Sequence, residues 1–495
     1  MQNFFFLAFL AIFLLALLLL KNTLKNRELT AFYKNFQTPE IGNKSDSLIK
    51  KLIFGHLIDF SRESGSTSAG FDWRRKCITE TGAHVIRFFS RKMLVIYSPE
   101  IVQFFTNLDA ELVEKSQNFK RIFNNLTSSV LFKEGKDWKA DRKHFEPFCF
   151  YDMVKKYASY FYSGAQDLST KLLDAGKSGK SVLVDQLVQE LTLKTLMASL
   201  LGIELDLSEE ESKQLNDDFI TVSMTMKLDK SLGDILAKIP LLRRFSKKGQ
   251  KEKAAFENLR NLVDQILDQA ANTKKISDLA FYLQKKTKMT RDEIAANIFL
   301  FTMAGHETNK SSIVWALYEL AKDPELQKQL VEEFNQKKAL GIDILTYVQQ
   351  ESLLSSFVSE VQRFYSVAPE IVPRTLKRSV TMPNGLVAPK GTTFMLGIWE
   401  SHMNPTSYFE PEKFNPRRFL DNDIAKNAFI PFSAGQRKCV GYKYGITQVR
   451  TVIATLLEKC EFKLDTAHHV NMTRVMTMNP HNGVKLFISP RKNDA

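Results

Sequence analysis

Apolar residues follow one another without interruption at the amino terminus, and no comparable run occurs later in the chain. Residues 4–20 carry no charge, and as a helix they would span about 25 Å, close to the hydrocarbon thickness of a thin bilayer. Lys21, Lys25 and Arg27 follow the run, so the positive-inside rule places the remaining chain in the cytosol. A cleaved signal peptide is the alternative, but no basic residue precedes the run and no small-x-small site follows it. We therefore expect residues 1–21 to be a membrane anchor.

A long helical pattern dominates the middle of the chain. Residues 292–324 form one continuous pattern that follows Thr290, a helix cap, and has Glu293 in capping-box position. Pro324 ends it. Its central residues are apolar on most sides, so we expect this helix to be buried.

The final third of the chain changes from helical to strand-like patterning. Residues 378–396 alternate short strand-like runs with Asn-Gly and Lys-Gly turns, and residues 479–488 read as a further hairpin. A polar linker is expected at residues 22–39. Helices followed by strands around one core predict a mixed α and β fold, mainly α-helical, over residues 40–495.

Composition narrows the classes of function. A net charge of +14 suits an acidic protein, a membrane surface or nucleic acid, but the chain has no nucleic-acid motif and no basic tail, so no nucleic-acid partner is expected. Cysteines 77, 149, 439 and 460 lie far apart without a CxxC pair. This spacing excludes a disulfide framework and is typical of a reducing compartment.

Cys439 has unusual neighbours in the segment FSAGQRKCVG, residues 432–441. Gly435 and Gly441 lie on either side of it, and glycine permits the close approach of a flat ligand. A lone cysteine with this clearance suits an axial thiolate ligand of haem iron. Taken by itself, Cys439 is more simply an inert buried residue.

The other residues of this segment favour the haem interpretation. Arg437 and Lys438 favour a thiolate over a thiol, and Phe432 supplies an aromatic wall. The full spacing, F-x-x-G-x-R-x-C-x-G, resembles the haem-binding loop of the cytochrome P450 family, the haem-thiolate monooxygenases. The resemblance implies haem b as the cofactor and Cys439 as the iron ligand. It also implies that the segment's aromatic, glycine and arginine residues bind the cofactor.

Glu360 and Arg363 are three residues apart on one predicted helix face, an arrangement that alone indicates a surface ion pair. The pair resembles the family's E-x-x-R motif. The family's third member then corresponds to Arg418 in the segment FNPRRF. The resemblance implies a buried carboxylate between two arginines behind the haem loop, with a role in core assembly.

Ala304, Gly305, Glu307 and Thr308 lie in the middle of the long helix. A glycine there costs about 1 kcal/mol relative to alanine, which close helix packing alone would explain. The segment AGHETN resembles the family's oxygen-binding motif. It implies room for dioxygen at Gly305 and proton relay by Glu307 and Thr308. Asn309 stands where the family usually has a hydroxyl residue. Because asparagine can still form hydrogen bonds, we expect proton delivery to be modified but not lost.

Trp138 and Arg142 are four residues apart and resemble the family's W-x-x-x-R, which holds a haem propionate; a stacked surface pair is the alternative. Arg374 and Arg437 are the other expected propionate partners, because arginine suits carboxylates. The resemblance runs from Trp138 to Gly441. Besides Asn309, the departures are a linker without the family's proline-rich run and three substitutions, Met403, Phe409 and Gly445, where the family often has Arg, Trp and Ala.

The resemblance implies a monooxygenase that receives electrons singly from an NADPH-dependent cytochrome P450 reductase and inserts one atom of O2 into an apolar small molecule. The expected location is the endoplasmic reticulum membrane, in contact with membrane lipid and with the catalytic domain facing the cytosol. Substrate specificity is expected from residues 104–131, 219–245 and 366–372, the second of which is also a candidate for bilayer insertion. The alternatives are a haem-thiolate isomerase or dehydratase that needs no O2, a non-catalytic haem sensor, and an anchored protein without haem.

Overall fold

The structure is a computed structural model. It describes residues 27–41, 72–88, 91–116, 126–203, 209–225, 247–273, 278–474 and 477–491, together with single positions 48, 51, 56, 59 and 120. The predicted anchor at residues 1–21 and most of the candidate bilayer-inserting segment lie outside these residues. Among the helices of the described ranges, none is long and apolar enough to cross a membrane.

Helices form most of the described chain. They are α2 (Arg27–Tyr33), α5 (Asp72–Arg75), α6 (Pro99–Asn107), α8 (Gly135–Cys149), α9 (Tyr151–Gly176), α10 (Val184–Leu196), α11 (Glu209–Thr225), α14 (Lys247–Thr273), α15 (Leu279–Lys286), α16 (Arg291–Lys322), α17 (Pro324–Ala339), α18 (Ile344–Tyr347), α19 (Leu353–Tyr365), α20 (Ile398–His402), α21 (Arg417–Leu420) and α22 (Tyr442–Lys459). A π-helical turn, η3 (Met197–Leu201), extends α10, and a 3₁₀ turn, η4 (Gly435–Arg437), precedes α22.

The strands are short and form small sheets. They are β1 (Ala83–Phe88), β2 (Arg91–Ile96), β3 (Val113–Lys115), β4 (Val182–Leu183), β5 (Arg374–Leu376), β6 (Val380–Thr381), β7 (Val387–Ala388), β8 (Thr393–Leu396), β9 (Cys460–Leu464), β10 (Met472–Arg474), β11 (Met478–Pro480) and β12 (Lys485–Pro490). The largest described sheet has the order β1-β2-β8-β5-β3, in which only the β2–β8 pair is parallel. The structure confirms the predicted mixed fold, which is mainly helical.

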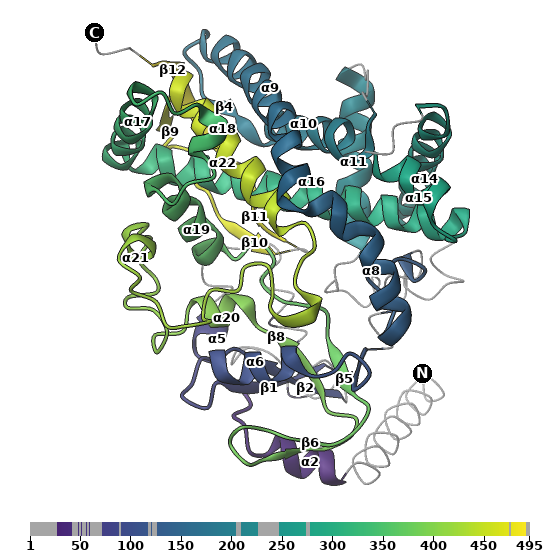
Figure 1. Cartoon of the computed structure of the whole chain (residues 1–495). Coiled ribbons are helices and arrows are strands. Elements are labelled where there is room, and N and C mark those ends of the chain that lie inside the picture. The colour runs from purple at the N-terminus through teal and green to yellow at the C-terminus, as the bar shows by residue number, and fades with distance from the viewer. Residues whose placement is uncertain are drawn as a thin grey trace, which may run out of the picture.

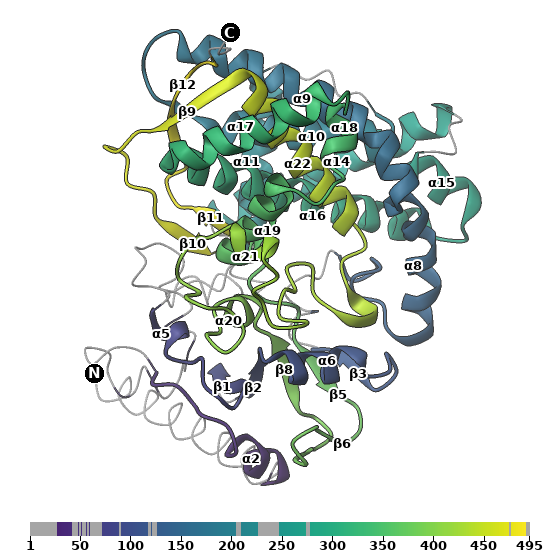
Figure 2. The same ribbon diagram turned by 60° about the vertical axis from the view of Figure 1, so that its left-hand side comes forward.

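The two halves of the molecule differ in character. In Figures 1 and 2 the sheet that contains β1, β2, β8 and β5 lies at one end with α2, α5 and α6, and the long helices fill the other end. Helix α22 packs on α9 and on α16. In the helical core, Trp315 of α16 stacks on Tyr365 of α19 with ring centroids 3.9 Å apart.

Helix α16 is the predicted long central helix. Thr290 accepts a hydrogen bond from the Glu293 backbone, and the Glu293 side chain accepts one from the Thr290 backbone, which completes the predicted capping box. Most side chains along the helix are buried on all sides. This explains why its sequence shows little separation into a polar and an apolar face.

Two predictions made from local patterning are wrong. Residues 27–36 are not a free linker: they form α2 and a following turn, and Phe32, Tyr33 and Phe36 are buried against the large sheet. Residues 479–488 are not a hairpin either. Strand β11 pairs with β10, whereas β12 pairs with β9 and β4. The turn between β11 and β12 therefore joins two different sheets, which local sequence does not reveal.

Candidate active site

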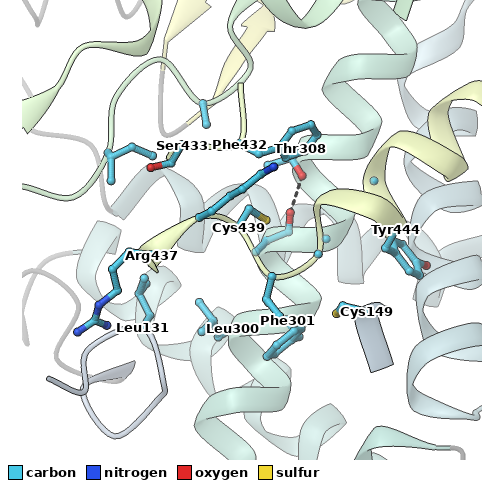
Figure 3. Close-up of a pocket in the computed structure, with 18 of the residues that line it drawn as sticks. Leu131, Cys149, Leu300, Phe301, Thr308, Phe432, Ser433, Arg437, Cys439 and Tyr444 are labelled. Atoms are coloured by element: carbon cyan, nitrogen blue, oxygen red, sulfur yellow. Dashed lines mark hydrogen bonds between the residues drawn. The ribbon is translucent and has the colours of Figure 1, made fainter. Parts of the chain in front are cut away.

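A cavity of about 440 Å³ lies between α16, α8, the segment before α22 and the loop after α19. Its wall is mainly apolar, with Phe145, Leu196, Leu300 and Phe301 among the lining side chains. Of the residues predicted to form the site, the wall contains Trp138, Arg142, Ala304, Gly305, Thr308, Arg374, Phe432, Arg437, Cys439 and Gly441. Segments that are far apart in the chain thus meet at one cavity, as Figure 3 shows.

The Cys439 loop is held by its own backbone. The Cys439 N–H donates to the Phe432 carbonyl at 2.9 Å, and the Lys438 N–H donates to the Gly435 carbonyl at 3.1 Å. Ser433 adopts a left-handed conformation with φ 64°, which is uncommon for a residue with a side chain. This closed loop presents the Cys439 side chain to the cavity (Figure 3).

The two glycines around Cys439 have different roles. Gly435 has φ +67°, and a Cβ there would lie 2.2 Å from the Thr106 carbonyl oxygen of α6. Gly435 is not among the residues that line the cavity, and it packs closely on α6; its contact with the cofactor stays a prediction. Gly441 does line the cavity, and a Cβ at this position would meet no atom within 4 Å. Gly441 therefore leaves the open space expected beside a flat ligand.

Burial raises the pKa of the Cys439 thiol, although the Gly441 N–H, Arg142 and Lys438 act in the opposite direction. Lys438 thus acts on the thiol in the predicted direction, but burial outweighs its effect. Arg437 does not act on the thiol as predicted: its guanidinium lies over the Trp138 ring at 3.8 Å. A metal ion deprotonates a coordinating thiol outright, so iron bound at this sulfur would reverse the effect of burial.

Cationic side chains gather at one side of the cavity. Arg437 also donates to Glu134 Oε2 at 3.0 Å, and Arg142 donates to the Lys438 carbonyl at 2.9 Å. Burial lowers the pKa of Arg437 to about 10, with Glu134 acting against the shift. The predicted arginines are thus held in place by protein groups while they face the cavity.

Lys115 is a member of this cluster that sequence reasoning missed. It lines the cavity, is 4% exposed, and lies directly opposite Arg374 in the β3–β5 register. Burial lowers the pKa of Lys115 to about 7, and Arg437 adds to the shift while Glu134 opposes it. Like charges on facing strand positions destabilise a sheet unless an anion lies between them. Lys115 becomes a candidate cofactor-binding residue only through its pairing with Arg374, and the sequence of either strand alone does not reveal that pairing.

These residues fit haem. The excess of buried cations matches the propionates, Gly441 leaves space for a flat ring, and the Cys439 thiol offers an axial ligand. Two carboxylates lie close to the cluster: Glu134, through its bonds to Arg437 and to the Lys115 backbone, and Glu146, which accepts from Arg142 Nε at 2.8 Å.

The middle of α16 forms the opposite wall. The Thr308 hydroxyl donates to the Ala304 carbonyl at 2.7 Å, as the dashed line in Figure 3 shows. A Cβ at Gly305 would lie 3.0 Å from Leu196 Cδ1 of α10. Gly305 therefore permits close packing between two helices, and it also lines the cavity.

Glu307 lies outside the described cavity wall. Its carboxylate accepts hydrogen bonds from the side chains of Thr477 at 3.1 Å and Asn479 at 3.0 Å. Burial opposes ionisation, but Lys310, His306 and these two bonds outweigh it and lower the Glu307 pKa. Glu307 is therefore an ionised side chain that is hydrogen-bonded to β11 and to the residue before it. It is not among the residues that line the cavity, whereas Thr308 is.

The predicted structural triad is present behind the site. Glu360 accepts from Arg363 Nε at 2.7 Å and from Arg418 Nε at 3.2 Å, and the side chains are at most 3% exposed. Arg363 also donates to the carbonyls of His402 and Pro411, each at 2.9 Å. The network ties α19 to the chain that leads into the Cys439 loop.

Comparisons with known proteins agree with this geometry. The family model for cytochrome P450 matches residues 49–486. Cytochrome P450 4A24 of Sus scrofa is 25% identical over 458 residues, which cover 88% of each chain. Cytochrome P450 4F12 of Homo sapiens is 25% identical over 431 residues, which cover 80% of each chain.

A solved structure shares the fold. The crystal structure of the cytochrome P450DA heme domain matches 92% of this chain and 98% of its own length, with a TM-score of 0.75 at 18% identity. The family model covers most of the chain and includes every predicted site residue. The chain therefore belongs to the cytochrome P450 family.

Proposed function

We propose that the protein is a monooxygenase that uses haem b and inserts one oxygen atom from O2 into an apolar small molecule, such as a lipid, sterol, terpenoid or foreign hydrophobe. Membership of the family implies a haem-thiolate cofactor, O2, a substrate and a redox partner in general. The observation that carries the proposal is that the Cys439 thiol and the Thr308 side chain line the same cavity. An iron ligand and a proton-handling group would therefore act on one enclosed space.

The chain's own residues have distinct tasks in this proposal. Haem bound at Cys439 would activate dioxygen, with the thiolate favouring O–O cleavage. Arg142, Arg374 and Arg437 would hold its propionates, together with Lys115. Trp138 stacks on Arg437 and keeps that guanidinium in place.

Protons must reach the distal wall while bulk water is kept out. The Thr308 hydroxyl would deliver these protons, and its hydrogen bond to the Ala304 carbonyl fixes its orientation. Glu307 would be the ionised group that relays protons to Thr308, and Thr477 and Asn479 hold its carboxylate in place. The apolar side chains of the wall exclude water and favour an apolar substrate.

We further propose an NADPH-dependent cytochrome P450 reductase as the electron donor. Lys438 lies over the Tyr442 ring at 4.0 Å, and Lys443 lies over the Tyr151 ring at 5.7 Å. Lys438 belongs to the Cys439 loop and Lys443 follows it in α22, and both would meet an acidic partner surface, which speeds association. Residues 1–21 as an anchor, residues 40–495 as the catalytic domain, contact with membrane lipid and a location at the endoplasmic reticulum remain part of this proposal.

The proposal is tested with the purified full chain, the reductase, NADPH and ¹⁸O₂. A lipid mixture and a panel of apolar compounds serve as candidate substrates, and products are analysed by mass spectrometry. We expect a product that carries one ¹⁸O atom and depends on NADPH and on the reductase. A product formed without O2 would instead support the isomerase or dehydratase alternative, and haem binding without any turnover would support a sensor.

A further inference from the structure

One carboxylate lies in the cavity wall apart from the cation cluster. Glu370, in the loop after α19, is the single acidic side chain among the described residues that line the cavity. Burial lowers the pKa of Arg374 and of Arg437, and Glu134 is the carboxylate that opposes this shift. Glu370 has no such effect on either arginine. It therefore lies away from the end of the cavity where the propionates are expected.

Two guanidinium groups hold the Glu370 carboxylate in place. Arg74 of α5 donates through Nη2 to Oε1 at 2.6 Å. Arg474 of β10 donates to Oε2 through Nε at 3.0 Å and through Nη2 at 2.5 Å. Arg74 also donates through Nε to Glu400 of α20 at 2.9 Å. These four side chains form a chain of alternating charge, which fixes the orientation of Glu370 from segments far apart in the sequence.

Of these four side chains, Glu370 alone is among the residues that line the cavity. Its side chain is 9% exposed, whereas those of Arg74 and Glu400 are at most 1% exposed. Burial opposes ionisation of Glu370, but Arg474 and Arg74 outweigh it and lower its pKa. An ionised carboxylate offers about four acceptor positions, and the two arginines fill three of them. The described chain therefore leaves one acceptor position, on Oε1.

The neighbours of Glu370 at the wall are apolar. Val367, Ala368, Ile371 and Val372 line the cavity beside it. A ligand group that reaches Glu370 therefore leaves water and meets an anion in apolar surroundings. Under these conditions a hydrogen bond to a charged group is worth more than one between neutral groups. A donor is favoured at this position, and a group without a donor is disfavoured.

We propose, on the basis of the proposed function, that Glu370 is a specificity-determining residue that binds a hydrogen-bond donor, a hydroxyl or an ammonium group, on an otherwise apolar substrate. The apolar body of the substrate would lie against the aliphatic and aromatic side chains of the cavity. A substrate carboxylate is disfavoured here, because Arg74 and Arg474 already bind carboxylates and Glu370 is negatively charged. The proposed substrate class thus narrows to apolar alcohols and amines.

The test is a calorimetric titration of the haem-loaded full chain without NADPH. Decan-1-ol and 1-methoxydecane share an alkyl chain and differ in the donor, as do decylammonium and decyltrimethylammonium. We expect the donor in at least one pair to bind about 10-fold or more tightly than its partner, and decanoate to bind more weakly than that donor. A preference in the first pair identifies a hydroxyl, and one in the second pair an ammonium group. Equal affinities within both pairs, or no binding of any probe, would overturn the proposal.

Two variants separate ligand binding from a structural role. Glu370→Gln keeps the size of the side chain and removes the charge, so the preference for the donor should fall about 3- to 10-fold. The matched control is Glu400→Gln, which changes a carboxylate on the same arginine that is not among the residues lining the cavity; its preference should match the wild type. Equal losses in both variants would reduce Glu370 to a structural residue.

Two further outcomes are also decisive. If Glu370→Gln does not fold, the affinity ratios of the wild type decide by themselves. A donor preference in a protein that shows no NADPH-dependent turnover would refute the proposed function and leave the assignment of Glu370 standing.

Discussion

Glu360 and Arg363 form a bidentate ion pair in which the guanidinium Nε and Nη2 donate to the two carboxylate oxygens at 2.7 and 2.8 Å. Both side chains are fully buried, and Arg418 adds a second cation on the same carboxylate. Removal of the Glu360 carboxylate would leave the buried guanidinium groups of Arg363 and Arg418 without their negatively charged partner. The pair therefore joins α19 to the segment from His402 to Arg418, which precedes the Cys439 loop.

Glu360→Gln should lower the free energy of unfolding by about 3–5 kcal/mol, because a buried charge loses its partner. The change is measured by urea denaturation. The matched control is Glu332→Gln, which removes the carboxylate of an exposed pair with Lys328 at 3.7 Å and should cost less than about 1 kcal/mol. Equal effects of the two variants would contradict the structural role of Glu360.

Gly435→Ala should destabilise the protein far more than Gly341→Ala. Both glycines have positive φ, 67° and 75°, so both substitutions carry a backbone cost of about 1–2 kcal/mol. A Cβ at Gly341 meets nothing within 4 Å, whereas at Gly435 it would lie 2.2 Å from the Thr106 carbonyl. The yield of soluble protein and the urea midpoint measure the difference. Similar behaviour of the two variants would show that Gly435 does not pack on α6 as described.

The helical class and the long helix follow from local patterns in the sequence, whereas the predicted cavity side chains follow from the resemblance of short motifs to those of the cytochrome P450 family. The capping box at Thr290 and the spacing around Cys439 are examples. Gly435 and Lys115 are different. The role of Gly435 depends on the position of α6, and that of Lys115 depends on β3 pairing with β5, so both are set by contacts between distant segments. The wrong hairpin at residues 479–488 has the same cause, since strand partners are chosen by the tertiary fold.

Acid should destabilise the protein below pH 6.5, partly through His402. Burial lowers the pKa of His402 to about 3, and Arg363 adds to the shift. The His402 ring is neutral, since its Nε2 accepts from the Ile430 N–H at 3.0 Å. The unfolded chain therefore binds a proton that the folded chain does not. The stability from this group is complete above pH 6.5 and is lost as pH falls towards 3.

The slope from His402 is at most about 1.4 kcal/mol per pH unit. His402→Gln keeps an acceptor for Ile430 and should make unfolding less dependent on pH between 6.5 and 4. Urea midpoints at several pH values measure the effect, with exposed His469 changed to Gln as the control. A slope unchanged by His402→Gln would contradict the neutral buried ring.

Thr308→Val should reduce product formation per NADPH by about 100-fold, the low end expected for loss of a positioned proton-transfer group. Valine keeps the shape of the side chain and removes the hydroxyl that donates to Ala304. Thr308→Ser should restore much of the activity, because serine retains the hydroxyl. The ratio of product to NADPH measures both variants. Full activity of Thr308→Val would exclude Thr308 from proton transfer.

The central claim is that Cys439 ligates a haem iron through its thiolate. The most direct test is the absorption spectrum of the purified, reduced protein exposed to carbon monoxide, recorded beside Cys439→Ala. We predict a strongly red-shifted Soret band for the wild type that is lost in the variant. A folded wild-type protein without a haem band, or with the same band in the variant, would contradict the claim.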